Sequence, residues 1–290
     1  MGIPTIKSYP MPKENELPKN KVSWDIDPNR AVLLIHDMQK YFLKTFESEQ
    51  SPVVQLIQNI QLIKDECVKN GVPVVYTAQP GNQDPGDRAL LQDFWGPGLR
   101  DISEHTAVVD KLEPTEQDLV LTKWRYSAFQ RTDLQEIMHK QGRDQLIICG
   151  VYTHIGCLLT ASEAFMRDIQ TFFVADAVAD FSYEDHIMAL KYVASRCGFV
   201  TTTNHLLEKF KSEPQIITLD QLKEQVAELL DEPPNALSES ENLIDRGLDS
   251  IRMMSLIEEW RQIGIQVDFM SMTENPTLLH WMNLLSYSKT

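Results

Sequence analysis

QLIICGVYTHIGCLLTASEAFMRD (145–168) identifies the fold class, because it joins a short apolar run to a loop and a helical segment. The run QLIICG (145–150) is typical of a strand that is buried on both faces. The loop that starts at Gly150 opens a helix, and a helix candidate covers 161–168. A strand that leads through a loop into a helix is the repeating unit of α/β proteins.

The same unit repeats on both sides of this stretch. Five further apolar runs are expected to be strands: AVLLI (31–35), VPVVYTA (72–78), DLVLTK (118–123), TFFVAD (171–176) and GFVTTT (198–203). Amphipathic segments at 51–70 and 185–197 are helix candidates. This alternation predicts a doubly wound, mostly parallel sheet covered by helices on both faces, a Rossmann-like three-layer α/β domain. Ligands bind such sheets at the carboxyl ends of the strands.

Two parts of the chain depart from this pattern. Residues 1–30 are rich in Pro, Lys and Asn without periodicity, so we expect an extended arm on the domain surface. The apolar pattern fades after Leu207, and the polar segment EKFKSEPQ (208–215) is expected to be a linker. Helix candidates follow at 219–230 and 251–263. We therefore expect an enzyme domain over 1–210 and a small helical domain over 216–290.

The composition argues against several classes of partner. The 42 acidic and 27 basic residues give a net charge of −15, which would repel nucleic acid and anionic membranes. No run approaches the roughly 18 apolar residues of a membrane span, and MGIPTIKSYP (1–10) lacks an apolar signal core. The four cysteines lie far apart without a C-x-x-C pair. We expect a reduced, cytoplasmic protein without nucleic-acid or membrane partners.

The segment NLIDRGLDSIRMM (242–254) places a serine, Ser250, at or near the start of a helix. Gly247 permits a turn before it, and Asp249 precedes it directly. The free N–H groups and the dipole of a helix N-terminus favour an anionic phosphodiester on the serine oxygen. The alternative is that Asp249 or Ser250 merely caps the helix.

Candidate functional residues follow three of the predicted strands. Asp37 comes just after the first strand, and Lys123 lies at the end of the run 118–123. Such a pair indicates an active-site acid with its electrostatic partner, or equally a structural ion pair. Gln79 and Arg88 lie in YTAQPGNQDPGDR (76–88), and Trp95 follows in DFWGPG. An arginine and a lysine in one cleft indicate a substrate that bears carboxylates.

The C-terminal part resembles the acyl or aryl carrier domains of nonribosomal peptide synthesis. The resemblance covers residues 215–290 and rests on the attachment motif that ends at Ser250. It implies a four-helix domain with a covalent pantetheine 4'-phosphate on Ser250. It also implies a partner-facing surface at Met253, Met254 and Phe269, although ordinary core packing is an equal alternative for each.

The remaining chain, roughly residues 25–207, resembles the isochorismatase-like hydrolases. The motifs LLIHDMQ, TKWRYSAF and GVYTHIGC carry the resemblance in this order. Amide-cleaving members use an Asp, a Lys and a cysteine, but the cysteine position holds Gly156 here. Cys157 is one residue further, and one helical step of about 100° turns its side chain away. The histidines that bind metal in nicotinamidases are absent, so we expect no metal.

An Asp and a Lys without the cysteine is the pattern of true isochorismatases. Their fusion to an aryl carrier domain closely resembles the bifunctional enzymes of catecholate siderophore assembly. The resemblance implies hydrolysis of isochorismate to 2,3-dihydro-2,3-dihydroxybenzoate and pyruvate. It also implies four protein partners: a phosphopantetheinyl transferase, an enzyme that adenylates 2,3-dihydroxybenzoate, a condensation domain and, through the hydrolase domain, a second copy.

The vinyl ether of isochorismate is hydrolysed by protonation of its carbon and addition of water. We expect Asp37 to donate the proton, which requires a raised pKa in an apolar enclosure. Phe42, Trp95, Tyr126 and Tyr152 are expected to form that enclosure. We expect Lys123 to orient the acid or bind carboxylates, with Gln79 and Arg88 assisting.

The loop at 150–168 leaves three points open. Gly156 leaves room for a substrate ring that Tyr152 also lines, or alternatively meets the need of a turn. His36 and His154 border the region, but we interpret a lone histidine beside an apolar strand as hydrogen-bonded structure. The alternatives to an isochorismatase are a cysteine amidase that uses Cys157, or a carrier protein with an inactive hydrolase scaffold.

Overall fold

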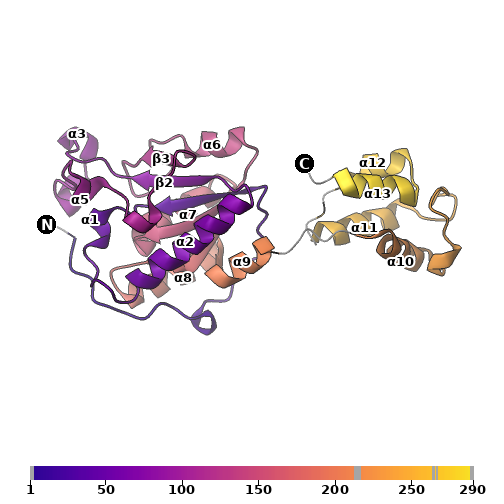
Figure 1. Ribbon diagram of the computed structural model, residues 1–290, viewed down its shortest axis with the longest axis horizontal. Helices are drawn as coiled ribbons and strands as arrows, with labels where there is room; N and C mark the ends of the chain where they lie inside the picture. The colour runs from indigo at the N-terminus through magenta and orange to yellow at the C-terminus, as the bar shows by residue number, and fades with distance from the viewer. Residues whose placement is uncertain (1–2, 212–216, 263–264, 266, 288–290) are drawn as a thin grey trace. The chain divides into compact units, whose positions relative to one another are not determined.

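The computed structural model describes residues 3–211, 217–262, 265 and 267–287. The chain divides into two compact units, Met1–Lys211 and Ser212–Thr290, which we describe separately (Figure 1). Residues 212–215 of the expected linker, and residue 216, where we expected the second domain to begin, lie outside the described residues. Within the described part, no helix is both long enough and apolar enough to cross a membrane.

The first unit is built on a parallel sheet of six strands. Their order is β3-β2-β1-β4-β5-β6. Each expected strand is present, with these bounds: β1 (Ala31–His36), β2 (Val74–Ala78), β3 (Leu119–Thr122), β4 (Gln145–Val151), β5 (Gln170–Ala179) and β6 (Phe199–Thr201). The pairings between these six strands are parallel. The α/β prediction is confirmed.

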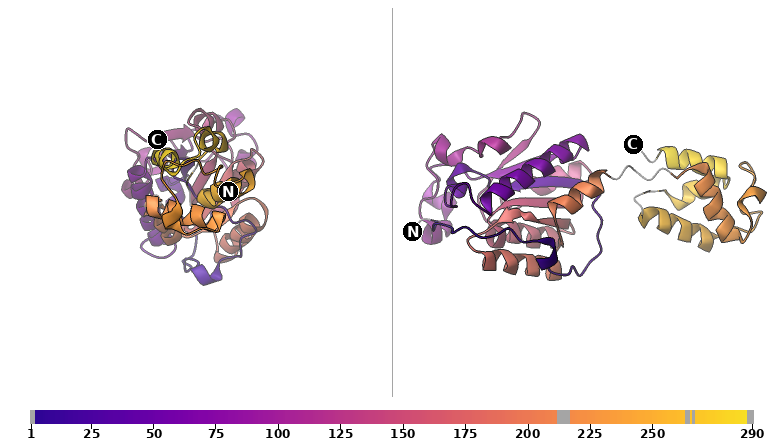
Figure 2. Two further views of the ribbon diagram at one scale, coloured as in Figure 1. Left: turned by 90° about the vertical axis from the view of Figure 1, so that its right-hand side faces the viewer. Right: turned by 60° about the horizontal axis from the view of Figure 1, so that its bottom comes forward.

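Helices cover both faces of this sheet. Helix α2 (Val53–Lys69) and α9 (Thr203–Lys211) lie on one face. The helices α6 (Leu134–Lys140), α7 (Leu158–Phe165) and α8 (Tyr183–Arg196) lie on the other (Figures 1 and 2). Strand β1 is buried throughout, because alternate side chains enter the two separate cores. This explains why parallel strands appear in the sequence as continuous apolar runs.

The end of α9 differs from the sequence-based expectation. Residues 208–211, which we assigned to a linker, form its last turn. Phe210 is buried in the core beside α2, and this contact holds the turn in place. One apolar residue in a polar segment gave too weak a periodic signal to predict it.

Short helices gather beyond the carboxyl ends of the strands. They are α1 (Lys40–Leu43), α3 (Pro85–Arg88), α4 (Leu91–Trp95), α5 (Ser103–Thr106) and the π-turn η3 (Thr153–Cys157). The chain between β2 and β3 also contains the 3-10 turn η2 (Asp110–Leu112). In Figure 1, α1, α3 and α5 lie together at this end of the unit. The loops that can bind a ligand are therefore close to one another.

The N-terminal arm crosses the same end of the unit. After residue 3 it is extended, apart from the turn η1 (Glu14–Glu16). Ile6 is buried, and its N–H donates to the Thr45 carbonyl at 2.7 Å. The Tyr9 hydroxyl accepts the Asp180 N–H at 2.7 Å and bonds to His186 Nδ1 at 3.2 Å. The arm is thus fixed to the loop that follows β5.

The described part of the second unit contains four helices, as the carrier resemblance implied. They are α10 (Leu219–Leu230), α11 (Ser250–Gln262), α12 (Phe269–Glu274) and α13 (Leu278–Tyr287), with the turn η4 (Pro234–Ala236). The rings of Trp260 and Trp281 meet edge to face at 6.4 Å in its centre. Of the expected helix 251–263, residue 263 lies outside the described residues.

Candidate active site

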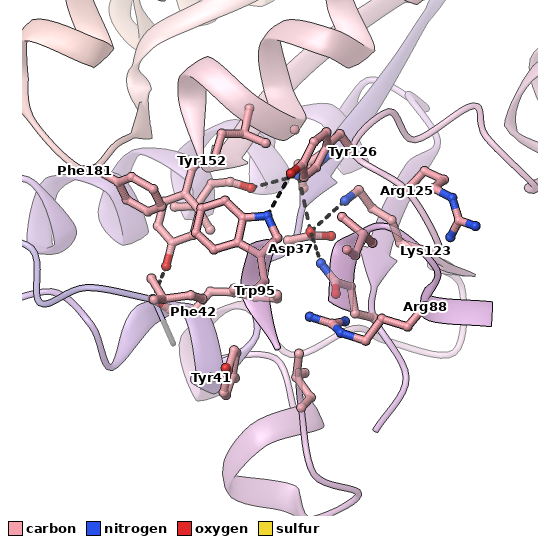
Figure 3. A pocket seen from close by; sticks show the side chains of 18 residues that line it. Asp37, Tyr41, Phe42, Arg88, Trp95, Lys123, Arg125, Tyr126, Tyr152 and Phe181 are labelled. Atoms are coloured by element: carbon pink, nitrogen blue, oxygen red, sulfur yellow. Dashed lines mark hydrogen bonds and ion pairs between the residues drawn. The ribbon is translucent and has the colours of Figure 1, made fainter. Parts of the chain in front are cut away.

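One pocket opens at the carboxyl end of the sheet in the first unit, and it contains about 600 Å³ of empty space (Figure 3). The structure places all nine side chains or positions that we predicted for a substrate site around this pocket: Asp37, Phe42, Gln79, Arg88, Trp95, Lys123, Tyr126, Tyr152 and Gly156.

Asp37 lies at the base of the pocket, one residue after β1, with a left-handed backbone φ of 50°. Its Oδ1 accepts the Thr77 hydroxyl at 2.7 Å. Its Oδ2 accepts Lys123 Nζ at 2.9 Å and Gln79 Nε2 at 3.3 Å. Lys123 follows β3 directly, so two strand ends bring these charges together (Figure 3).

The pKa of Asp37 is opposite to our expectation. Burial by itself raises the pKa of this carboxyl, but the Lys123 ammonium, His36 and the hydrogen bonds from Lys123 and Thr77 together lower it below its ordinary value. The aromatic walls are present, but they do not determine the direction in which the pKa of Asp37 shifts. The expectation was wrong because a cation 2.9 Å away outweighs the apolar enclosure.

Arg88 provides a second cation for the pocket. The residue is only 4% exposed, and its Nε donates to the Gly96 carbonyl. Its guanidinium lies against Gly98, where a Cβ would approach to 2.5 Å. Nη1 is buried, and it has no hydrogen-bond partner among the described residues. Burial lowers the pKa of Arg88. A buried guanidinium nitrogen without a partner is suited to a ligand carboxylate.

Aromatic side chains form the wall opposite these cations (Figure 3). The Trp95 indole N–H donates to the Tyr126 hydroxyl at 2.7 Å. The Tyr152 hydroxyl donates to the Phe42 carbonyl at 2.9 Å and bonds to Thr45 Oγ1 at 3.0 Å. Because these polar ends are bonded to one another or to backbone, the wall presents mostly apolar ring surface to the pocket.

Gly156 and Tyr152 line the same pocket, but the side of Gly156 on which a Cβ would lie is occupied by protein. A Cβ built on Gly156 would lie 2.2 Å from Cε1 of the His36 ring. His36, which we had set aside as structural, fills the volume. Gly156 is also absent from the described residues with positive φ, so a turn does not require glycine here. The room that glycine leaves for a substrate ring stays a prediction.

Cys157 is a buried residue of the core, as predicted. It is fully buried among the side chains between the sheet and α7, and it does not line the pocket. Burial raises the pKa of this thiol well above its ordinary value. A neutral, enclosed thiol is a poor nucleophile.

The sequence did not single out several residues of the pocket. Phe181 follows β5, so the rule of strand carboxyl ends could have identified it. Ile3 reaches the pocket from the arm, and no local sequence signal predicts that. The other lining residues that we missed are His36, Tyr41, Leu91, Leu99, Arg125, Val151 and Ile155. Among the described residues there is no group of three His, Cys, Asp or Glu side chains that could hold a metal.

In the second unit, Ser250 is exposed and is the first residue of α11. The N–H of Arg252 donates to Asp249 Oδ1 at 2.9 Å, so Asp249 is the capping residue. Gly247 makes the preceding turn with a φ of 105°. Met254 is 60% exposed and Phe269 is half-buried, but Met253 is only 1% exposed and packs in the core. The partner surface that we considered therefore cannot include Met253.

Both units match known protein families. Residues 31–205 match the Isochorismatase domain, and residues 220–285 match the phosphopantetheine attachment site. A protein of Bacillus subtilis (strain 168) named Isochorismatase is 53% identical over 99% of this chain and 96% of its own length. Enterobactin synthase component B of Escherichia coli (strain K12) is 49% identical over 99% of each chain. A solved cysteine hydrolase of Pseudomonas syringae pv. phaseolicola matches 66% of this chain and 97% of its own, with 25% identity and a TM-score of 0.59.

Proposed function

The chain belongs to the isochorismatase family and ends in a phosphopantetheine-attachment domain, and on this premise we propose the role of each site residue. It is a hydrolase that converts isochorismate to 2,3-dihydro-2,3-dihydroxybenzoate and pyruvate, and it is also a carrier. One observation carries the proposed roles. The buried Asp37–Lys123 pair faces Arg88, whose Nη1 has no partner among the described residues, in a pocket without a cysteine.

Two of the cations that line the pocket, Arg88 and Lys123, bind the substrate. Isochorismate has two carboxylates, and the pocket offers the guanidinium of Arg88 and the ammonium of Lys123. A carboxylate on Arg88 Nη1 satisfies a donor that is otherwise buried without a partner among the described residues. Gln79 Nε2 reaches Asp37 at 3.3 Å and can also donate to the substrate. The apolar walls of Trp95 and Tyr152 enclose the ring.

Asp37 donates the proton in this proposal. Without substrate, Lys123 keeps the pKa of Asp37 low. A bound dianion shares the Lys123 charge and adds negative charge beside Asp37, and both effects raise the pKa of a carboxyl. Substrate binding thus raises the pKa of Asp37, which the empty pocket keeps low. The acid is protonated where and when the substrate is present.

The reaction needs no covalent enzyme intermediate. The proton of Asp37 goes to the terminal carbon of the vinyl ether, and the electron pair of the C=C bond forms the new C–H bond. Water then adds to the resulting oxocarbenium carbon and returns a proton to Asp37. In the hemiketal, the bond between the former vinyl carbon and the ring oxygen then breaks, the C=O bond of pyruvate forms from the added hydroxyl, and the proton of that hydroxyl passes to the ring oxygen. The apolar walls limit other water molecules.

A cysteine amidase is disfavoured by the position of Cys157. Its thiol is fully buried, and burial raises its pKa. An inactive hydrolase scaffold would not need a buried ion pair in one pocket with an arginine nitrogen that has no partner among the described residues. Replacing a buried pair by apolar residues is often neutral or stabilising. Release of pyruvate from isochorismate distinguishes an isochorismatase from both alternatives, the cysteine amidase and the inactive scaffold.

In the carrier domain, we propose Ser250 as the attachment residue. Its side chain is exposed at the start of α11, and Asp249 rather than Ser250 caps the helix. The hydroxyl is therefore accessible to a phosphopantetheinyl transferase. The pantetheine group supplies a thiol that carries an acyl group as a thioester. Met254 and Phe269 form the surface that we propose for the partner enzymes.

The relatives suggest the pathway. One of them is named Enterobactin synthase component B. We propose that this chain likewise serves catecholate siderophore assembly and carries 2,3-dihydroxybenzoate, which a separate enzyme adenylates and a condensation domain receives. The four cysteines are free and buried, which supports a reducing, cytoplasmic setting.

We further propose a homodimer through the hydrolase unit. Large apolar side chains line a groove beside α4 and α7, and Leu90 and Met166 are 75% and 74% exposed. Such a patch is characteristic of a protein interface. Arg125 and Glu163 line the same groove, so the surface carries both signs of charge. A two-fold interface between identical patches pairs these opposite charges, which favours a second copy as the occupant.

The dimer is tested by sedimentation of the full chain. Met166→Glu in the groove should shift the protein from dimer to monomer. Met188→Glu, a charge at a 45% exposed methionine of α8 outside the groove, should leave the dimer intact. If the protein with Met166→Glu is still a dimer, the interface does not lie at this groove.

The central experiment measures both activities of one purified protein. Incubation with isochorismate should release pyruvate, and incubation with coenzyme A and a phosphopantetheinyl transferase should add one pantetheine 4'-phosphate. Ser250→Ala should abolish the modification and leave pyruvate release unchanged. Ser255→Ala, at an exposed serine of the same helix, should change neither. Modification without pyruvate would leave a carrier on an inactive hydrolase.

A further inference from the structure

His36 occupies an enclosed position at the end of β1. The residue is fully buried, and its Nδ1 donates to the Val151 carbonyl at 2.8 Å. Its backbone lies so close to Gly150 of β4 that a Cβ there would meet the His36 oxygen at 2.1 Å. The ring is therefore held by its own hydrogen bond, and the His36 backbone is held by the neighbouring strand.

The imidazole fills the space where a side chain at residue 156 would begin. A Cβ on Gly156 would lie 2.2 Å from Cε1, 2.8 Å from Nε2 and 3.1 Å from Nδ1 of His36. The obstacle is a flat, buried ring and not the end of a flexible chain. Any residue other than glycine at 156 thus requires the ring to move within a closely packed interior.

His36 is not suited to proton transfer near neutral pH. Burial lowers the pKa of His36 to about 4, with Lys123 adding to this effect, whereas Asp37 and the Val151 and Tyr126 carbonyls oppose it. The ring is therefore neutral in the active protein. Its Nδ1 lies 3.9 Å from Asp37 Oδ2, beyond hydrogen-bond distance. Its contribution is its volume and its position beside Asp37.

We infer that His36 is a specificity-determining positioning residue, because its ring and a side chain at 156 exclude each other. This inference rests on the proposed function, in which water and not an enzyme thiol attacks the substrate. Position 156 borders the same pocket as Asp37 and Lys123, and a side chain there would begin in the space that the His36 ring occupies. His36 keeps that place closed. Residue 36 thereby commits the pocket to hydrolysis without a covalent intermediate.

A double-mutant cycle on the full chain tests the exclusion. Gly156→Ala should lower the Tm by about 4–10 °C, as overpacking of a core does in a unit of this size. His36→Val removes the ring beyond Cγ and retains a residue that is favourable in strands. The double variant should therefore recover at least half of the loss that Gly156→Ala causes. Gly86→Ala, at an exposed glycine with ordinary φ, should leave the Tm within about 1 °C.

Chemical reactivity distinguishes specific exclusion from a general packing defect. In the variant with both His36→Val and Gly156→Cys, the introduced thiol should react with iodoacetamide at least tenfold faster than in Gly156→Cys alone. In this reaction the thiolate sulfur displaces iodide from carbon. The four native cysteines are buried and should react slowly in both proteins.

The outcomes separate this inference from the proposed function. Gly156→Ala without a loss of Tm, or no recovery in the double variant, would overturn the exclusion even if the wild type releases pyruvate. If Gly156→Ala fails to fold, recovery of folding by His36→Val supports the inference, and continued failure overturns it. A wild type that releases no pyruvate would refute the proposed function, while the Tm cycle would still report the steric relationship.

Discussion

Lys123 Nζ lies 2.9 Å from Asp37 Oδ2, and the two side chains are only 2% and 6% exposed. This pair lowers the pKa of Asp37 in the empty pocket despite the opposing effect of burial. The same pair places the acid where a bound carboxylate can compete for the lysine. The ion pair thus links substrate binding to the protonation of the acid.

Replacement of the acid tests its role directly. Asp37→Asn should lower kcat for pyruvate release by about 10²–10⁴-fold, the usual contribution of a positioned general acid. The free energy of unfolding should also fall, because Lys123 loses its buried carboxylate partner; complete loss of a buried partner costs about 3–5 kcal/mol. The rate should be measured at a temperature where circular dichroism shows a folded protein.

A matched control for this change is Asp110→Asn. Asp110 pairs with Lys40 at 2.6 Å, but its side chain is 87% exposed. Neither kcat nor stability should change measurably, because exposed pairs contribute little. A variant of Asp37 that kept the full rate would refute its role as proton donor.

Arg88 should contribute to binding of the substrate more than to its conversion. Arg88→Gln removes a charged donor to a carboxylate, a contact of about 1.5–3 kcal/mol, so KM should rise about 10–150-fold with a much smaller change in kcat. Initial rates over a range of isochorismate concentrations give both constants. Arg100→Gln, at an exposed arginine that does not line the pocket, should leave KM unchanged. A fall in kcat at constant KM would assign Arg88 to the transition state instead.

The sequence predicted the parts of the site that depend on topology. Asp37 and Lys123 come directly after strands, and parallel strands end at the same edge of a sheet, so their meeting follows from the strand pattern. The strand series was readable because each strand is buried on both faces. Helix α10 also begins and ends where the periodicity places it.

The sequence could not predict features that depend on packing between distant residues. The close approach of His36 and Gly156 joins the end of β1 to the turn η3, and only the 2.2 Å distance from a Cβ built on Gly156 to the His36 ring reveals it. The lowered pKa of Asp37 likewise results from the competition between burial and a cation. Ile3 reaches the pocket because the arm happens to cross that end of the sheet. No local pattern encodes these relationships.

The arm should support the pocket through Tyr9. Tyr9→Phe leaves the buried N–H of Asp180 without its acceptor, which costs about 1–3 kcal/mol. A fall of the Tm by about 3–10 °C is expected in a unit of this size. Asp180 precedes Phe181, which lines the pocket, so KM should rise as well.

The control for this change is Tyr183→Phe. Its hydroxyl donates to the exposed Glu16 at 3.1 Å, so its loss should alter the Tm by about 1 °C or less. Both variants are compared by thermal unfolding and by initial rates. Equal Tm values for Tyr9→Phe and the wild type would show that the arm is not anchored at this bond.

The pair of His154 and Asp180 should make stability depend on pH. His154 Nδ1 lies 2.6 Å from Asp180 Oδ1; burial lowers the pKa of His154, but the Asp180 carboxylate outweighs this and raises it above its ordinary value. A raised pKa in the folded state stabilises the protein fully below about 6.5, the unfolded value, and this stabilisation is lost as the pH rises through the folded pKa. Denaturant unfolding at successive pH values should therefore show the wild type losing its advantage over His154→Asn with rising pH. A constant difference for His154→Asn would mean that Asp180 leaves the pKa of His154 the same in the folded and unfolded states.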